Sequence, residues 1–136
     1  MTAEELLSRR DGRPLKVLIV DDEEHIRNVF RDFCLSSPLF TVTTAAGGEE
    51  AIHIVEKDDF DLVTIDLVMP EMSGIDAIET IRRQKPHLPV VIITGNATER
   101  LISEAGRFGS CRVLRKPIGL GQFLEELVDI AGDKCQ

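Results

Sequence analysis

The sequence is poor in cysteine and histidine, and it has no long apolar run. Its three cysteines and three histidines stand singly, with no Cys-x-x-Cys pair and no His/Cys cluster. We therefore expect neither a disulfide framework nor a structural zinc site. No apolar stretch approaches the roughly 20 residues of a membrane helix, and the N-terminus, MTAEELLSRRDGR, lacks the apolar region of a signal peptide. These absences predict a cytoplasmic protein without membrane contacts.

Basic residues are also in deficit. Lys and Arg number 16 against 24 Asp and Glu, which gives a net charge of −8 at pH 7. A surface that binds nucleic acid needs a basic patch, so we expect no nucleic-acid partner for this chain. The length of 136 residues suits one domain and is too short for two.

An apolar run of strand length is followed by a helix-length amphipathic segment five times. The expected strands are Leu15–Val20, Phe40–Ala45, Leu62–Asp66, Val90–Thr94 and Arg112–Arg115, and the expected helices cover about 24–36, 48–57, 74–84, 98–107 and 120–131. We expect a domain over 15–131, preceded by a loose or short helical arm at 1–14 and followed by a tail at 132–136.

Three of the expected strands are apolar without alternation, namely Val17–Val20, Leu62–Ile65 and Val90–Ile93. Such strands are typical of a parallel sheet that is covered by helices on both faces. Five strand–helix units in this length predict an α/β fold with a doubly wound open sheet. Ligands of such sheets bind at the carboxyl ends of the strands.

Polar residues stand at those ends. Asp21 and Asp22 follow the first strand, Asp66 ends the third, Thr94 ends the fourth and Lys116 follows the fifth. Each alone is explained by a turn, a helix cap or a solvated charge. Together they predict a site, because the fold directs all of these ends to one crevice.

The chemistry of that site follows from its charges. Recessed carboxylates need a cation, and hard oxygen ligands favour Mg²⁺, which often accompanies a phosphoryl group. A carboxylate can attack phosphorus to give an acyl phosphate. Lys116 and Thr94 would then stabilise the charge on the transferring oxygens.

Four motifs carry a resemblance to a known family. They are VDDEE (20–24), TIDLVMPEMSGID (64–76), VVIITG (90–95) and VLRKPI (113–118). In this order and at strand ends they resemble the receiver domain of two-component response regulators, over about Leu15 to Ile130. The resemblance implies the flavodoxin-like strand order 2-1-3-4-5. It also implies a phosphorylation-switched signalling module that accepts its phosphoryl group from a sensor histidine kinase or a histidine phosphotransfer protein.

The resemblance also implies residue roles. Asp66 is the expected phosphoacceptor, Thr94 the switch hydroxyl and Lys116 the lysine that meets the phosphoryl group. The implied Mg²⁺ ligands are Asp22, Asp66, the backbone carbonyl of Val68 and, through a water, Asp21. The Lys116–Pro117 peptide bond is expected to be cis. No enzymatic activity is implied beyond the domain's own phosphorylation and dephosphorylation.

Some local features add to this interpretation and others depart from it. Gly74 is expected to allow a close approach at the start of the third helix, and Gly95 to leave the crevice open. Val113 stands where the family usually has Tyr or Phe, and the chain contains no Tyr. The usual aromatic switch therefore cannot operate. The last helix begins within GLG (119–121), without an acidic or hydroxyl cap, and its first turn is expected to fray.

Alternatives from other classes fit less well. A phosphatase of the haloacid dehalogenase type needs a second acid two residues after the nucleophile, where this chain has Val68. A flavodoxin-like FMN-binding module needs a phosphate loop after the first strand, where DDEE repels phosphate. A degenerate receiver, acting only as an interaction module, would not need the complete polar set. Whether the chain acts alone or belongs to a longer regulator stays open.

Overall fold

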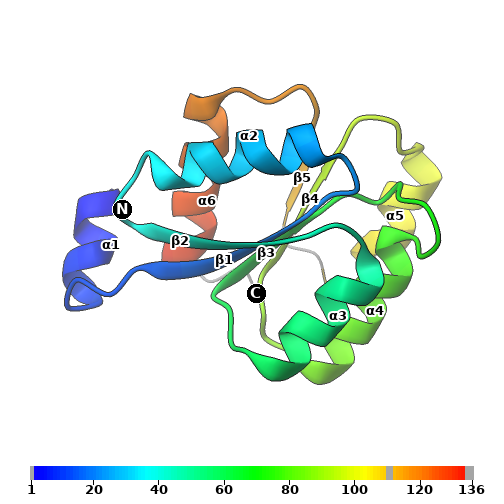
Figure 1. Cartoon of the computed structure of the whole chain (residues 1–136), viewed down its shortest axis with the longest axis horizontal. Helices are drawn as coiled ribbons and strands as arrows, with labels where there is room; N and C mark the ends of the chain where they lie inside the picture. The colour runs from blue at the N-terminus through cyan, green and yellow to red at the C-terminus, as the bar shows by residue number, and fades with distance from the viewer. Residues whose placement is uncertain (1, 110–111, 134–136) are drawn as a thin grey trace.

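The structure is a computed structural model in which residues 2–109 and 112–133 are described. Its five strands form one parallel sheet in the order β2-β1-β3-β4-β5, which confirms the predicted doubly wound arrangement (Figure 1). The strands are β1 (Leu15–Val20), β2 (Phe40–Ala45), β3 (Leu62–Ile65), β4 (Val90–Thr94) and β5 (Arg112–Arg115).

Helices cover both faces of the sheet. They are α1 (Ala3–Arg9), α2 (Glu24–Leu35), α3 (Gly48–Lys57), α4 (Gly74–Gln84), α5 (Glu99–Gly106) and α6 (Leu120–Asp133). Figure 1 shows α2 and α6 on one face and α3, α4 and α5 on the other. No helix among the described residues is long and apolar enough to cross a membrane.

The first strand explains why both faces are covered. Its side chains alternate, so that Leu18 and Val20 join the core beneath α3 and α4, whereas Val17 and Ile19 join the core beneath α2 and α6. All four side chains are buried. The run Val17–Val20 is apolar without alternation because its side chains enter two cores, one on each side of the sheet.

The observed boundaries differ from the predicted ones by one or two residues. The third strand ends at Ile65 and not at Asp66, and the Asp66 side chain is hydrogen-bonded at the end of the sheet. The fourth predicted helix begins at Glu99 because Thr98 is its N-cap and accepts from the amide of Leu101.

The N-terminal arm contains a short helix that packs on the domain. The Thr2 hydroxyl caps α1 by accepting from the amide of Glu5. Leu6 is only 7% exposed and belongs to the core beneath α6. Leu6, together with Ala3 and Leu7 that pack against the same core, therefore attaches the arm to the domain.

The cysteines and histidines can be placed in part. Cys34 lies buried in α2, where burial raises the pKa of its thiol to about 12. Cys111 and Cys135 lie outside the described residues. His25, His53 and His87 are exposed.

Candidate functional site

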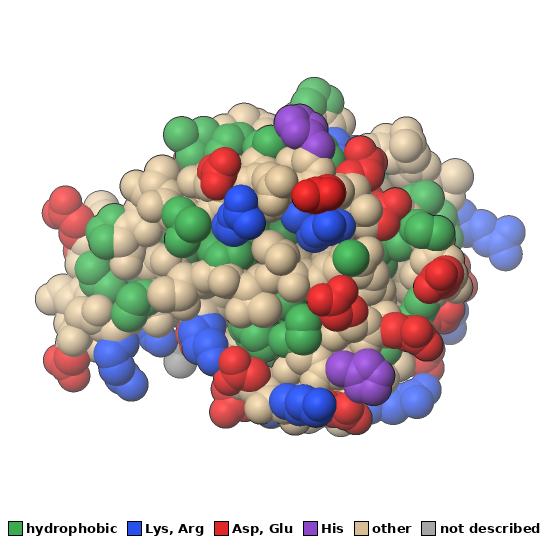
Figure 2. All heavy atoms as spheres, viewed as in Figure 1, with side chains coloured by type: hydrophobic (Ala, Val, Ile, Leu, Met, Phe, Trp, Pro, Cys, Tyr) green, Lys and Arg blue, Asp and Glu red, His purple; other side chains and the backbone are tan. Residues whose placement is uncertain are grey.

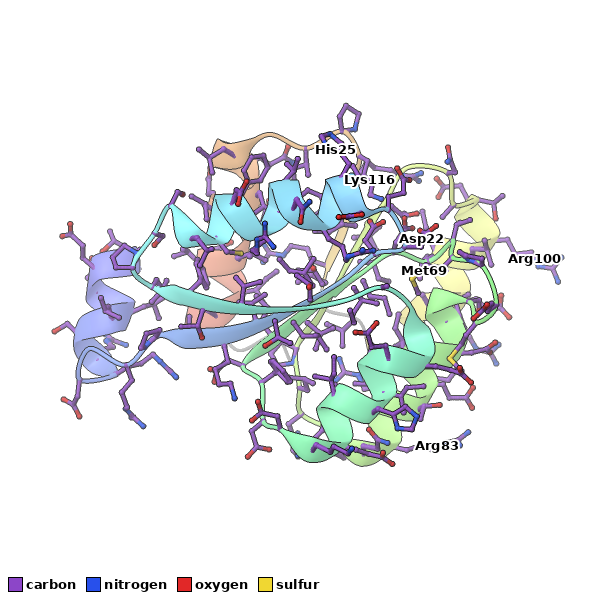
Figure 3. All side chains as sticks on the ribbon, in the orientation of Figure 1. Asp22, His25, Met69, Arg83, Arg100 and Lys116 are labelled. Atoms are coloured by element: carbon purple, nitrogen blue, oxygen red, sulfur yellow. The ribbon has the colours of Figure 1, made fainter. Side chains whose placement is uncertain are left out.

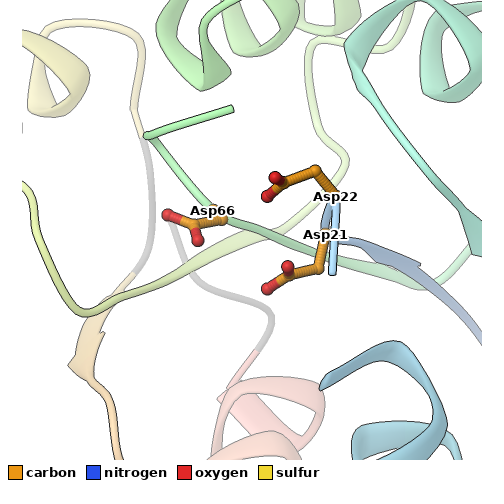
Figure 4. Close-up of side chains that lie close together, drawn as sticks. All are labelled: Asp21, Asp22 and Asp66. Carbon is orange, nitrogen blue, oxygen red and sulfur yellow. The ribbon is translucent and has the colours of Figure 1, made fainter. Parts of the chain in front are cut away.

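Three aspartates meet at the carboxyl ends of two neighbouring strands. Asp21 and Asp22 follow β1, and Asp66 follows β3, which pairs with β1. One carboxylate oxygen of each lies within 4.8 Å of the others (Figure 4). The chain leaves β1 for β2 on one side and later enters β3 on the other, so this is the point where strand order reverses.

The Asp66 carboxylate is held by three donors from different elements. Its Oδ1 accepts from the Thr94 hydroxyl at 2.8 Å and from the Val68 amide at 3.1 Å. Its Oδ2 accepts from the Lys116 ammonium at 2.8 Å. Asp66 is 6% exposed and Thr94 is fully buried. Four parallel strands thus bring together the carboxylate, hydroxyl and ammonium groups that the sequence predicted to meet.

Lys116 bridges two carboxylates. Its ammonium lies 2.7 Å from Asp21 Oδ2 as well as 2.8 Å from Asp66 Oδ2. Burial acts to lower the pKa of Lys116, but the hydrogen bonds to Asp21 and Asp66 outweigh it, so the pKa is raised above its usual value. The Lys116 amide donates to the Thr94 carbonyl at 3.0 Å, and the Lys116–Pro117 bond is cis, as expected.

Asp21 and Asp22 differ in their surroundings. Asp21 is 2% exposed, and its Oδ1 accepts from the Glu23 amide at 3.0 Å. Asp22 is the more exposed of the two and makes no hydrogen bond or ion pair with any described residue. Figure 3 shows Asp22 at the same end of the sheet as Lys116. Asp22 is therefore the one carboxylate of the three whose oxygens are unengaged.

Two supporting contacts were missed by sequence reasoning. The amide of Glu23 bonds back to Asp21 two residues earlier, a local pattern that Asp favours and that the DDEE run could have suggested. Arg27, in the first turns of α2, donates to the Asp21 carbonyl at 2.7 Å. No sequence signal marks Arg27, because a helical arginine has many possible partners.

The loop after Asp66 is tightly built. A Cβ added at Gly74 would lie 2.3 Å from the Asp66 carbonyl oxygen, which confirms the predicted close approach. Glu71 has φ of 69°, and the Met72 amide donates to the Pro70 carbonyl across it. A Cβ at Gly95 would meet the Lys116 side chain at 3.4 Å, which is an ordinary van der Waals contact, so the lysine stem does not by itself require a glycine there.

The acidic cluster fits a hard divalent cation. Octahedral Mg²⁺ with bonds near 2.1 Å places its ligand oxygens about 3 Å apart for neighbours and about 4 Å for opposite pairs. The carboxylate oxygens of Asp21, Asp22 and Asp66 lie within 4.8 Å of one another, which is close to these values. One of the three carboxylates can therefore act through a water and not as a direct ligand. A cavity of about 240 Å³ opens beside them, lined by Asp22, Asp66, Val68, Lys116 and their neighbours. The cluster carries three negative charges against one ammonium, which favours a cation.

Val113 lies half-buried on β5, where its side chain packs against the core on the α4 and α5 side.

Hydrogen bonds hold both ends of α5. Arg115 of β5 donates to the Glu99 carboxylate at 2.6 Å and to the Ala97 carbonyl at 3.4 Å. At the other end of α5, Arg82 of α4 donates to the carbonyls of Phe108 and Gly109. Both ends of α5 are thus tied to neighbouring elements.

Known proteins resemble the chain in sequence. The family described as response regulator receiver domain matches residues 17–128. The chemotaxis protein CheY-3 of Vibrio cholerae is 34% identical over 118 residues, which cover 85% of this chain and 91% of that protein. A protein-glutamate methylesterase/protein-glutamine glutaminase of Pyrococcus horikoshii is 38% identical over 125 residues. The match covers 86% of this chain but only 34% of that protein. The chain likewise spans 37% of the probable transcriptional regulatory protein TcrX of Mycobacterium tuberculosis.

Solved structures agree on the fold. A CheY-like receiver domain protein from Methanospirillum hungatei superimposes with a TM-score of 0.86 at 22% identity, over 90% of this chain and 97% of that one. The response regulator domain of Thermotoga maritima CheB superimposes with a TM-score of 0.78 at 29% identity, over 90% of this chain and 97% of that one. The family match extends over most of the chain and includes every residue of the acidic site, and the chain therefore belongs to the response regulator receiver domain family.

Proposed function

We propose that the chain is a phosphorylation-switched receiver in which Asp66 accepts a phosphoryl group from a phosphohistidine. The donor is a sensor histidine kinase or a histidine phosphotransfer protein. One observation carries the assignment to Asp66. Of the three clustered aspartates, it alone contacts both the Thr94 hydroxyl and the Lys116 ammonium.

The proposed reaction is a displacement at phosphorus. An Asp66 carboxylate oxygen forms the new P–O bond while the P–N bond of the donor breaks, and the electron pair of that bond returns to the imidazole nitrogen. Thr94 and Lys116 lie at 2.8 Å from the two Asp66 oxygens and can turn their hydrogen bonds to the phosphoryl oxygens. Neither residue needs to be brought to the site.

The residues proposed to hold Mg²⁺ are Asp22, Asp66 and the backbone carbonyl of Val68 directly, and Asp21 through a water. The cation supplies charge that offsets the carboxylates and the phosphoryl oxygens. The unengaged oxygens of Asp22 support a direct role. Asp21 supports an indirect one, because its two oxygens already accept from Glu23 and Lys116.

The proposed receiver domain covers 15–131, with 1–14 as an arm and 132–136 as a tail. The buried side chain of Leu6 indicates that the arm packs on the domain. The chain covers 91% of CheY-3 but only 34% of the methylesterase and 37% of TcrX, so its relatives include both short receivers and longer proteins. The proposal holds for both, since the phosphorylation site lies within the matched residues.

Phosphorylation can be tested with a small acyl phosphate and intact mass spectrometry. With Mg²⁺ present, we expect a single gain of about 80 Da, as one carboxylate takes up one phosphoryl group. A parallel sample in which a chelator removes Mg²⁺ should show little gain. Equal gains with and without Mg²⁺, or no gain with it, would contradict the proposal.

A further inference from the structure

A second and larger cavity lies at the opposite edge of the sheet, where the strands begin. Its volume is about 750 Å³, against about 240 Å³ beside the acidic cluster. Its walls are α1, the loops 58–61 and 84–89, and the end of α6. Sites for small organic molecules have volumes of roughly 300–1,000 Å³, so the cavity is large enough to bind one.

Segments outside the family match build part of this cavity. The matched residues run from 17 to 128. Leu6, Arg9 and Arg13 line the cavity from before that range, and Ala131 and Gly132 line it from beyond. The flanking segments therefore complete a cavity whose remaining wall lies within the matched residues.

The inner wall of the cavity is apolar. Leu6, Leu15, Val55 and Leu88 line it, and each is at most 7% exposed. These side chains belong to the packed cores on the two sides of the sheet. An apolar group that entered here would lose contact with water without displacing polar partners.

The rim carries unbalanced positive charge. The three carboxylates that line it each already hold a cation: Asp58 pairs with Lys16, Asp59 with Lys85 and Asp61 with Arg10. Two further guanidinium groups, those of Arg9 and Arg13, have no acidic partner among the described residues. Arg13 donates only its Nε, to the Arg10 carbonyl. Figure 2 shows several Lys and Arg side chains at the lower left of the view, with Asp and Glu side chains beside them. On a chain of net charge −8, this rim is suited to an anion.

We propose that this cavity binds a small amphipathic organic anion. Arg9 and Arg13 hold its acidic head group, and the apolar wall of Leu6 and Leu88 contacts its body. The inference is independent of phosphorylation, because the cavity shares no lining residue with the acidic site.

Anilinonaphthalene sulfonate is a suitable probe, since it has a sulfonate, an N–H and an apolar ring system. The test is a fluorescence titration of the full chain, with amide shifts followed by NMR. We expect saturable binding of one probe, shifts centred on residues 84–89 and α1, and weakening by salt. Arg9→Gln with Arg13→Gln should weaken binding about fivefold or more.

Matched controls make the test decisive. Arg100→Gln with Arg107→Gln removes two exposed arginines elsewhere and should leave the affinity unchanged. Laurate should displace the probe, whereas a dodecyl ammonium cation should not. Absence of saturation, shifts confined to another surface, or equal losses in the two arginine pairs would overturn the proposal.

Discussion

The ammonium nitrogen of Lys116 and the Oδ2 atom of Asp66 lie 2.8 Å apart, and the same nitrogen lies 2.7 Å from Asp21. The side chain of Lys116 is 16% exposed, that of Asp66 is 8% exposed and that of Asp21 is 2% exposed. In the protein without metal, the Lys116 ammonium is therefore the positive charge that compensates the two buried carboxylates of Asp21 and Asp66. Asp22, the third aspartate, has no such partner among the described residues.

Lys116→Met should show how far Lys116 and Mg²⁺ can each compensate the buried carboxylates. Without Mg²⁺, the variant should lose about 3 kcal/mol of unfolding free energy, because two buried carboxylates remain without a counter-charge. With saturating Mg²⁺, most of the loss should disappear. Urea unfolding measures both. Lys85→Met is the control, since its partner Asp59 is 93% exposed and the pair should contribute less than about 1 kcal/mol. A loss in Lys116→Met that Mg²⁺ did not reduce would contradict this account.

The raised pKa of Lys116 predicts how stability depends on pH. A lysine whose pKa is higher in the folded state adds stability below its usual pKa of 10.5 and loses it as pH rises through the folded value. The metal-free protein should therefore lose stability above that pH, and Lys116→Met should lose less. The buried Cys34 thiol, with its pKa near 12, acts in the same direction from about pH 9 upward, but equally in both proteins. Thermal unfolding at stepped pH measures the difference, and parallel curves would refute the assignment.

Substitution of Asp22 should affect Mg²⁺ affinity more than stability, whereas substitution of Asp21 should affect stability more than Mg²⁺ affinity. Asp22→Asn should weaken Mg²⁺ binding more than about tenfold, because a direct ligand is lost. It should cost little stability, since Asp22 has no partner within the described structure. Asp21→Asn should weaken Mg²⁺ less, but it should lower stability more because it removes a buried partner of Lys116. Calorimetry suits the titration, as the chain has no Trp or Tyr to report binding. The reverse order of affinities would mean that Asp21 is the direct ligand.

The switch should work through α5 and not through an aromatic side chain. On phosphorylation, the Thr94 hydroxyl should turn from Asp66 Oδ1 to a phosphoryl oxygen, and the loop that follows Thr94 should shift with it. That movement acts on the start of α5, where Arg115 contacts Ala97 and Glu99. Hydrogen exchange with a phosphate mimic and Mg²⁺ should change most in residues 95–108. Val113→Ala should leave that change largely intact. Exchange altered only around Asp66 would indicate a receiver without this switch.

Particular residues show how far the sequence could predict the molecule. The apolar runs at Val17–Val20, Leu62–Ile65 and Val90–Ile93 predicted buried parallel strands. Their ends placed Asp21, Asp66 and Thr94 at one edge of the sheet. The bridge from Lys116 to both aspartates was not predictable, because it depends on side-chain geometry set by three separate strands. The packing of the arm was missed for another reason. A helix as short as α1 buries only Leu6, which leaves no periodic pattern to detect.

The most direct test of the central claim compares the rates at which the wild-type chain, Asp66→Asn and Asp76→Asn gain mass from a small acyl phosphate with Mg²⁺. Asp66→Asn removes the nucleophile but keeps its shape, whereas Asp76 is an exposed aspartate in α4. The account predicts that the wild-type chain and Asp76→Asn gain one phosphoryl group at similar rates and that Asp66→Asn gains none. Uptake by Asp66→Asn at the wild-type rate would contradict it.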